Sequence, residues 1–392
     1  MKFGNIDLGR YDKLFSTADR TYFQKFVDTN GILKANNRFW ASKFVKDNMA
    51  TPTDADGAAT FKAIAVTKSL APMADFVTPF SANPQNDNDG FAFYTGSIPD
   101  FGRGFNTTAI QRYQFEMMFK EFGRDTDIVM QYTNDLQKLY DAGNARLSNM
   151  AAQLLSTGQI NTTTGTGRGQ GIIHKSKANI PAANFLTCGA KVWSDPTCNI
   201  PQQMHDIEED ARTATGFEGT FMWEIDENFL KTTFLGNTYV QSIVKNFFAG
   251  QRIVYDANFV ITYPMLLEAM QDANVRPFGM IVPIYERQLE QTLTGRTSVN
   301  GWDETIAVLR PMGFAGVIKY AAIPEIVVSN SYGTSVVQKT TALLEGGIMG
   351  IINYVKDNGG YGEWHTDMRG SAIPVLTEFP YHFIVDMTAK DS

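Results

Sequence analysis

The sequence predicts an α+β fold built from one very long helix and several separated strand segments. Between residues 125 and 156 no proline interrupts a stretch in which apolar residues recur at three- and four-residue steps, which is typical of a helix. Runs rich in β-branched and aromatic residues follow later, without a regular alternation of strand and helix. Of the 392 residues 43% are hydrophobic, so the chain can build substantial cores and is not expected to be disordered.

Residues 1–59 are predicted to form an N-terminal arm. Aromatic residues are scattered through it, a helical stretch is expected near 19–27, and residues 50–60 have the composition of a linker. So short a segment cannot bury its aromatic rings by itself. We therefore expect the arm to lie on another part of its own chain or on a neighbouring copy.

Residues 60–123 are predicted to project as an extended two-stranded loop. Residues 61–67 favour a strand, and aromatic and polar residues alternate over 112–119, which predicts the returning strand. The residues between them, 79–104, are dense in Pro, Gly, Asn and Asp. They are expected to form an elaborate loop at the tip, of the kind that often binds a partner.

The helix predicted at 125–156 is the strongest local signal in the sequence. At 1.5 Å per residue it would be roughly 45–50 Å long, so it is expected to act as a spine. Gly158 suits its C-terminal end. The residues of its apolar stripe are Ile128, Tyr132, Leu136, Leu139, Gly143, Leu147, Met150 and Leu154, whereas Asn149 is expected on another face.

The remaining chain is expected to mix helices, strands and loops. A helix is predicted at 201–215, where Pro201 suits the first turn and acidic residues favour the N-terminal half. The other expected elements are a loop or hairpin tip at 162–171, mixed signals over 229–248, short helices at 263–274 and 340–354, strands at 278–285, 316–320, 325–329 and 382–387, and a loop at 358–370.

Charge and composition exclude several classes of function. The formal net charge is −7 and no basic stripe is present, which disfavours tight phosphate or nucleic-acid binding. Only two cysteines, Cys188 and Cys198, occur, too few for a disulfide framework or a cysteine-only zinc site. The N-terminus lacks the apolar stretch of a signal peptide, and runs such as 346–355 are too short to span a membrane.

Three glycine-rich or acidic loops imitate ligand sites without meeting their requirements. The stretch 165–171 lacks the Gly-Lys-Ser/Thr sequence of a phosphate-binding loop. The stretches 53–57 and 86–90 imitate calcium loops. Aligned on their glycines, they lack the acidic first and glutamate twelfth positions that an EF-hand needs. Ordinary turns are the better interpretation of all three.

One acidic cluster has the spacing of a possible metal site. Glu363, His365 and Asp367 would share one face of a strand and could grip a metal, but the surrounding glycines favour a solvated loop.

Glu224, Asp226 and Glu227 contain carboxylates of the type a glycosidase uses, yet nothing pairs two of them across a cleft. Cys188 has no signature of a cysteine nucleophile. We therefore predict no catalytic, cofactor-binding or metal site, no cofactor and no enzymatic activity.

Three stretches of the sequence carry a family resemblance. The first is the spine helix with its closing Thr157-Gly158-Gln159-Ile160, and the second is Val192-Trp193-Ser194-Asp195-Pro196 with the acidic helix and Thr215-Gly216 after it. The third is the ending Ile373-Pro374-Val375 to Phe379-Pro380. In this order they resemble the spine helix, the aromatic-Asp-Pro segment and the closing strand of the major capsid proteins of tailed bacteriophages with the Hong Kong 97-type fold, most closely the phage lambda major capsid protein (protein E) family.

The resemblance implies a domain organisation and a set of partners. The implied parts are an N-terminal arm at 1–59, an extended loop over a neighbouring subunit at 60–123, a peripheral domain at 124–223 with the spine helix, an axial domain at 224–345, and a return to the peripheral domain at 346–392. The chain would form hexamers and pentamers of itself in a virion capsid assembled in the bacterial cytoplasm. Scaffolding, portal and decoration proteins would be further partners, contact with packaged DNA would be weak, and no membrane would be involved.

The sequence is also compatible with two other functions. An encapsulin-like cellular nanocompartment would use the same fold and would be marked by a cargo enzyme. A carbohydrate-active enzyme using Glu224 or Asp226 is the third interpretation. For the capsid interpretation, scaffolding is expected to be a separate protein. Covalent cross-linking through Lys62 or Lys68 is not favoured.

Overall fold

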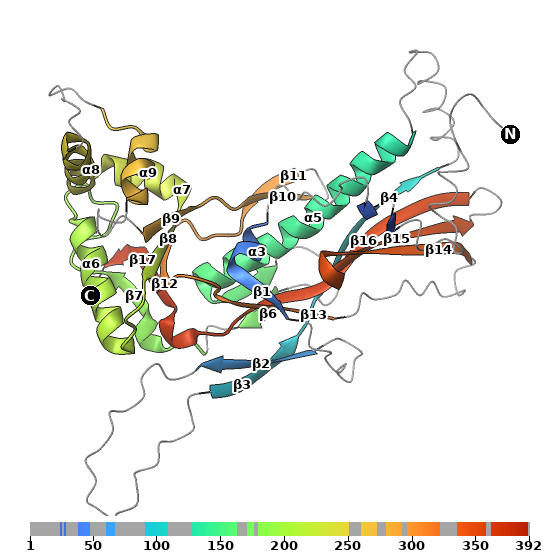
Figure 1. The fold of residues 1–392 in the computed structure, drawn as a ribbon, viewed down its shortest axis with the longest axis horizontal. Coiled ribbons are helices and arrows are strands. Elements are labelled where there is room, and N and C mark those ends of the chain that lie inside the picture. The colour runs from blue at the N-terminus through green and yellow to red at the C-terminus, as the bar shows by residue number, and fades with distance from the viewer. Residues whose placement is uncertain are drawn as a thin grey trace, which may run out of the picture.

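The computed structural model describes residues 24–25, 27–28, 38–47, 60–66, 91–108, 128–162, 171–175, 179–250, 260–272, 280–291, 296–321, 335–357 and 362–390. Helices and sheets in this part of the chain gather around two hydrophobic cores, which lie toward opposite ends of an elongated body (Figure 1). The predicted mixture of long helix and separated strands is confirmed.

The first core lies between the long helix α5 (Ile128–Thr157) and a large sheet. The strand order of this sheet is β1 (Phe44–Asp47), β13 (Gly316–Tyr320), β16 (Gly362–Leu376), β15 (Met349–Asp357) and β14 (Ser335–Leu344), with β4 (Asp100–Thr107) also paired to β16. The first half of β16 pairs antiparallel with β15 and β4, and its last residues pair with β13. One long strand thus connects all parts of the sheet.

Helix α5 buries the stripe that its sequence predicts. Every described side chain of the stripe is buried, from Tyr132 to Leu154. At Gly143 a Cβ atom would come within 2.4 Å of the Met349 sulfur, so glycine allows the helix to lie directly on the sheet. Gly158 ends the helix in the left-handed conformation, with φ of 71°, and its N–H donates to the Leu154 carbonyl at 2.9 Å.

The C-terminal half of α5 is buried on more faces than one stripe requires. Asn149, expected on another face, is buried, and so are Tyr140 and Asn144. The short helix α3 (Phe39–Lys43) packs on this side of α5, and the Trp40 indole donates to the Asn144 amide oxygen at 3.0 Å. Packing by a distant segment, rather than periodicity, decides this burial.

Part of the predicted arm therefore lies on its own chain. Trp40 and Phe44 are buried in the first core, and β1 pairs in parallel with β13. Gln24, Lys25, Val27 and Asp28 are helical, as expected near 19–27, and Val27 is also buried in this core. Arm residues other than 24–25, 27–28 and 38–47 are outside the described part of the chain.

The second core surrounds a five-stranded sheet covered by helices. Its strand order is β7 (Phe185–Cys188), β17 (Phe383–Lys390), β12 (Ile306–Pro311), β8 (Phe221–Asp226) and β9 (Ile281–Ile284). The helices are α6 (Ile200–Thr215), α7 (Glu227–Phe229), a π-helical turn (Leu230–Phe234), α8 (Thr238–Gly250) and α9 (Tyr263–Gln271). The helix predicted at 201–215 is confirmed, with Asn199 as its N-cap.

The boundaries predicted for the domains do not coincide with the two cores. Helix α6 falls in the predicted peripheral segment 124–223 and β17 in the predicted returning segment 346–392, yet both contribute buried residues to the second core. The reason is that β17 pairs with both β12 and β7 of the five-stranded sheet. The chain thus passes between the cores more often than a division into continuous segments allows.

The strand that returns along β2 (Thr60–Val66) is not the predicted one. Its partner is β3 (Phe91–Ser97), and the prediction of 79–104 as a loop is wrong where β3 and β4 lie. Gly96 lies opposite Phe61, whose ring would come within 2.7 Å of a Cβ atom there, so the glycine accommodates the ring. Residues 112–119, predicted as the returning strand, lie outside the described residues.

Two predictions near the C-terminus are wrong. Residues 340–354 form two antiparallel strands, β14 and β15, because Glu345, Gly346 and Gly347 adopt positive φ angles and reverse the chain. Residues 362–370 are strand rather than loop, because Trp364, Thr366 and Met368 alternate with polar residues and face the core.

The remaining expected elements have mixed outcomes. The predicted strands near 278–285, 316–320 and 382–387 and the helix near 263–274 are confirmed, and 229–248 is mostly helical. The other described strands form two hairpins, β5 (Gln159–Thr162) with β6 (Gly171–Lys175) and β10 (Arg287–Gln291) with β11 (Arg296–Asn300). Residues 325–329, predicted as a strand, are outside the described part.

The docking of α3 on α5 predicts a large loss of stability for Trp40→Ala. The substitution would leave a cavity against α5 and an unpaired Asn144 oxygen, so unfolding free energy should fall by about 3–5 kcal/mol. Urea unfolding of the purified protein measures the change. Val45→Ala, at an exposed side chain of β1, should change it by less than about 1 kcal/mol. Equal effects of the two substitutions would contradict the packing described for α3.

Candidate functional site

The acidic cluster around Glu224 forms a buried ion triad. Glu224 lies on β8 with its side chain fully buried, between Arg310 of β12 and Lys43 at the end of α3. Arg310 donates through Nε to Glu224 Oε2 at 3.0 Å and through Nη2 to Oε1 at 2.9 Å, and Lys43 also donates to Oε1. Both carboxylate oxygens are therefore used within the protein.

The electrostatics of this triad exclude a role for Glu224 as a general acid. Burial alone would raise its pKa, but the charges of Arg310 and Lys43 and their hydrogen bonds outweigh burial and hold the pKa at about 2. The group is consequently ionised at neutral pH. With no exposure to solvent it also cannot meet a substrate.

The other two residues of this acidic cluster cap or pair with local structure. Asp226 Oδ1 accepts from the backbone N–H groups of Asn228 and Phe229 and so caps α7. Burial raises the pKa of Asp226. Glu227 forms an ion pair with Lys231 at 3.1 Å. The three carboxylates therefore serve different structural contacts and do not face one another across a cleft.

Glu363, His365 and Asp367 lie on strand β16, not in a loop, and alternate with buried residues. His365 stacks on Tyr354 with ring centroids 5.0 Å apart, and its Nε2 lies 3.3 Å from Glu363 Oε2. Tyr354 donates to Asp367 at 3.3 Å, and burial, followed by the charge of Asp367, raises its pKa to about 12. The described residues contain no group of three metal-ligating side chains placed to hold an ion.

The other sequence candidates offer no reactive group in the described residues. Cys188 and Cys198 are both buried, and burial raises the pKa of the Cys198 thiol, which makes it a poor nucleophile. The calcium-like stretches 53–57 and 86–90 lie outside the described part of the chain, as does 165–171 except Gly171 at the start of β6.

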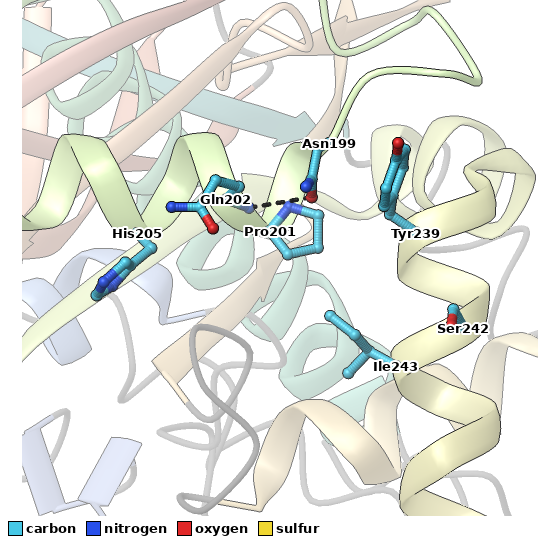
Figure 2. A pocket seen from close by; sticks show the side chains of 7 residues that line it. All are labelled: Asn199, Pro201, Gln202, His205, Tyr239, Ser242 and Ile243. Carbon is cyan, nitrogen blue, oxygen red and sulfur yellow. Dashed lines mark hydrogen bonds between the residues drawn. The ribbon is translucent and has the colours of Figure 1, made fainter.

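An open pocket of about 480 Å³ lies between α6 and α8 (Figure 2). Pro201 and Ile243 provide apolar surface between the two helices, and the exposed Tyr239, Gln202 and His205 lie around them. Asn199 is also in the lining and accepts from the Gln202 N–H at 3.3 Å. A partly apolar floor with a polar rim is typical of a surface that receives another group.

The folded chain also leaves many large apolar side chains in solvent. They are Val45, Ile64, Tyr239, Val260, Tyr285, Leu289, Met312, Phe314 and Leu343. Tyr285 and Leu289 belong to the region of the β10–β11 hairpin, whereas Met312 and Phe314 lie on the turn between β12 and β13. Contiguous apolar patches, rather than single exposed residues, are the ones that mark sites of protein association. Among the helices of the described residues, none is long and apolar enough to cross a membrane.

The comparison with solved structures decides the fold. A candidate capsid protein of a prophage of E. coli CFT073 superposes with a TM-score of 0.53 at 14% identity, covering 95% of this chain and 99% of that chain. The chain shares the fold of that protein. The predicted Hong Kong 97-type capsid fold is thereby confirmed.

Two further structures are similar over most of their length. A phage-related protein of Bordetella bronchiseptica RB50 has a TM-score of 0.46 at 9% identity, with 94% of this chain and 96% of that chain covered. The capsid of cyanophage P-SCSP1u has a TM-score of 0.45 at 10% identity, with 90% and 88% covered. No protein-family profile matches the sequence, and no curated protein matches it significantly.

The ion triad predicts a loss of stability in acid. Glu224 has a pKa of about 2 when folded and an ordinary value of 4.5, so the unfolded chain binds its proton first as pH falls. The contribution is fully present above pH 5 and should be lost by about pH 2, on the order of 3 kcal/mol. Urea unfolding at a series of pH values measures it.

A matched pair of variants isolates the titration of Glu224. Glu224→Gln removes the titrating group and should reduce the slope of unfolding free energy against pH between pH 5 and 2. It should also lower stability at pH 7 by about 3–5 kcal/mol. Glu227→Gln, at a partly exposed ion pair, should keep the wild-type slope. An unchanged slope in Glu224→Gln would contradict the triad.

His382 predicts a second, higher pH window. Its Nε2 donates to the Leu155 carbonyl at 2.8 Å, and burial lowers its pKa to about 4 from the usual 6.5. The unfolded chain again takes up the proton first, so stability should fall as pH drops from about 7 to 4. His382→Gln should remove this slope in unfolding measurements, whereas His205→Gln, at an exposed residue, should not. The reverse pattern would refute the assignment.

Proposed function

We propose that this chain is a major capsid protein, which self-assembles into the icosahedral head shell around the double-stranded DNA of a tailed bacteriophage. The observation that carries the proposal is the superposition on the E. coli prophage protein, which spans nearly the whole of both chains. A match over a single core would have been compatible with many functions. A superposition that covers 95% of this chain and 99% of the other is more restrictive.

Among major capsid proteins, we propose that the chain belongs to the phage lambda major capsid protein (protein E) family. Its support is the sequence resemblance described above, including Trp193-Ser194-Asp195-Pro196 before the acidic helix. In the structure this stretch is held by specific packing and hydrogen bonds. Trp193 is buried in the second core 5.9 Å from Trp223, and Asp195 accepts from the N–H and hydroxyl of Thr197.

The two cores suggest how the subunit would be divided in a shell. The core around α5 and the large sheet would be the peripheral domain, and the core around the five-stranded sheet would be the axial domain. The β2–β3 hairpin would be the base of the extended loop that lies over a neighbour (Figure 1). Hexamers and pentamers of one chain need head-to-tail contacts, which close only when the rotation fits.

Surface chemistry favours association with copies rather than with nucleic acid. Nine large apolar side chains remain exposed in the described part of the folded chain. A net charge of −7 disfavours tight contact with DNA, so a packaged genome would remain mobile within the shell. Scaffolding, portal and decoration proteins are proposed as further partners because the sequence resembles the capsid family described above.

A non-enzymatic role agrees with the use of the acidic residues. The carbohydrate-active alternative depended on Glu224 or Asp226, but Glu224 is fully buried between two cations and Asp226 caps a helix. A glycoside hydrolase of the usual type needs two carboxylates that face a shared cleft. Neither residue meets this requirement.

Electron microscopy tests the proposal directly. The purified full-length protein, expressed alone and with the proteins encoded beside it, should form closed icosahedral particles of several megadaltons. A monodisperse 43.6 kDa monomer at high concentration in both preparations would contradict it. Particles that enclose a cargo enzyme, rather than DNA and a portal, would instead indicate an encapsulin-like nanocompartment.

A further inference from the structure

Strand β14 lies at the edge of the large sheet. Among the described strands it pairs with β15 alone. An edge strand offers a row of backbone N–H and C=O groups to which a strand of another molecule can add. The sequence of β14 favours such pairing, because it contains two valines and two threonines and because the Leu343 side chain is 55% exposed.

The side chain of Gln24 occupies this edge at Leu343. The Leu343 N–H donates to Gln24 Oε1 at 2.7 Å, and Gln24 Nε2 donates to the Leu343 carbonyl at 3.2 Å. Leu343 thus directs both of its backbone groups away from β15. A primary amide carries a donor and an acceptor side by side, as a peptide does, so Gln24 takes the place of a strand residue. Gln24 Nε2 also donates to Asp28 Oδ1 at 3.0 Å, which fixes the orientation of the amide.

The segment that carries Gln24 is anchored beside the same edge. Val27 is fully buried in the first core. Further along the N-terminal segment, Lys46 donates to Glu345 Oε2 at 2.9 Å and to the Glu345 carbonyl at 3.1 Å, and Arg38 also pairs with Glu345. Glu345 begins the turn that follows β14. Side chains of the N-terminal segment therefore hold both the end of β14 and the turn after it.

We propose that the helical residues 24–25 and 27–28 form a strap that covers the edge of β14 and prevents it from pairing with β14 of a second copy. A covering segment is one of the ways in which natural sheets avoid edge-to-edge association. A glutamine side chain suits this role because it satisfies the backbone groups of Leu343 without presenting a new strand edge of its own. The inference concerns an association that the fold prevents, and it does not depend on the capsid function.

Substitution of Gln24 tests the strap. Gln24→Ala removes both hydrogen bonds to Leu343, so the constant for association of the purified full-length protein with itself should rise about tenfold or more. Sedimentation velocity over a series of concentrations measures it, and electron microscopy ensures that closed shells are not counted as edge pairing. Lys25→Ala, at an exposed neighbour, should behave like the wild type. Equal association of Gln24→Ala and wild type would overturn the proposal.

A second substitution identifies the surface that associates. Thr341 lies two residues before Leu343 in unbroken register with β15, so its N–H is also directed away from β15. Proline at this position removes that donor without removing a hydrogen bond to β15. Gln24→Ala combined with Thr341→Pro should therefore return to the wild-type association constant.

A charged substitution keeps this test decisive if proline disturbs the fold. Gln24→Ala combined with Thr341→Lys places a charge on the edge and should also return to the wild-type association constant. Circular dichroism checks that each variant is folded. Continued association of a folded double variant would show that the copies meet at another surface, and it would overturn the proposal.

Hydrogen exchange measures the contact within one molecule. The Leu343 amide should be protected in the wild type and should exchange about tenfold faster or more in dilute Gln24→Ala. In concentrated Gln24→Ala it should be protected again as copies pair, and Thr341→Pro should abolish this dependence on concentration. Equal exchange in wild type and dilute Gln24→Ala would show that Gln24 does not cover the edge, whether or not the protein forms shells.

Discussion

The buried carboxylate of Glu224 is the point at which three distant segments of the chain are joined. Lys43 comes from the segment before β1, Glu224 from β8 and Arg310 from β12, and all three are almost completely buried. Removing charges from water is costly, and the cost is recovered only when each charge keeps its partners. Loss of any partner would leave an uncompensated charge, so the triad fixes these segments together. Through Arg310 and Lys43 it also fixes the backbone around Gly313 and Ala315, where the chain leaves the five-stranded sheet for the large one.

The two cores differ in what they contribute to the protein. Trp40 and α3 cover α5, so part of the N-terminal segment stabilises its own subunit and is not available to a neighbour. The polar contacts of Glu345 with Arg38, Lys46 and Tyr140 strengthen the same attachment. The second core instead carries the α6–α8 pocket and leads into the turn with the exposed Met312 and Phe314. In the proposed assembly, stability would be supplied inside the subunit, and the apolar surface that remains would be available for copies of the chain.

Local signals in the sequence predicted the helices well and the large sheet poorly. The stripe of α5, with Gly158 after it, and the Pro201 start of α6 depend on neighbours within a few residues. The apolar pattern over 340–354 predicts a helix where β14 and β15 form, although Gly346-Gly347 indicates a turn. The glycines around β16 conceal the alternation of Trp364, Thr366 and Met368.

The candidate site was less predictable still, because Lys43 and Glu224 are 181 positions apart and Glu224 and Arg310 are 86 apart. One signal was present: a charge inside each apolar run, at Glu224 and at Arg310, indicates a buried partner.

In the proposed assembly, internal packing holds the N-terminal segment while copies of the chain cover the exposed apolar side chains. Hydroxyl-radical footprinting of unassembled subunits and assembled particles tests it most directly. Trp40 should be protected in both states, whereas Met312 and Phe314 should be labelled in subunits and protected in particles. Equal labelling of Met312 and Phe314 in the two states, or strong labelling of Trp40 in subunits, would contradict the account.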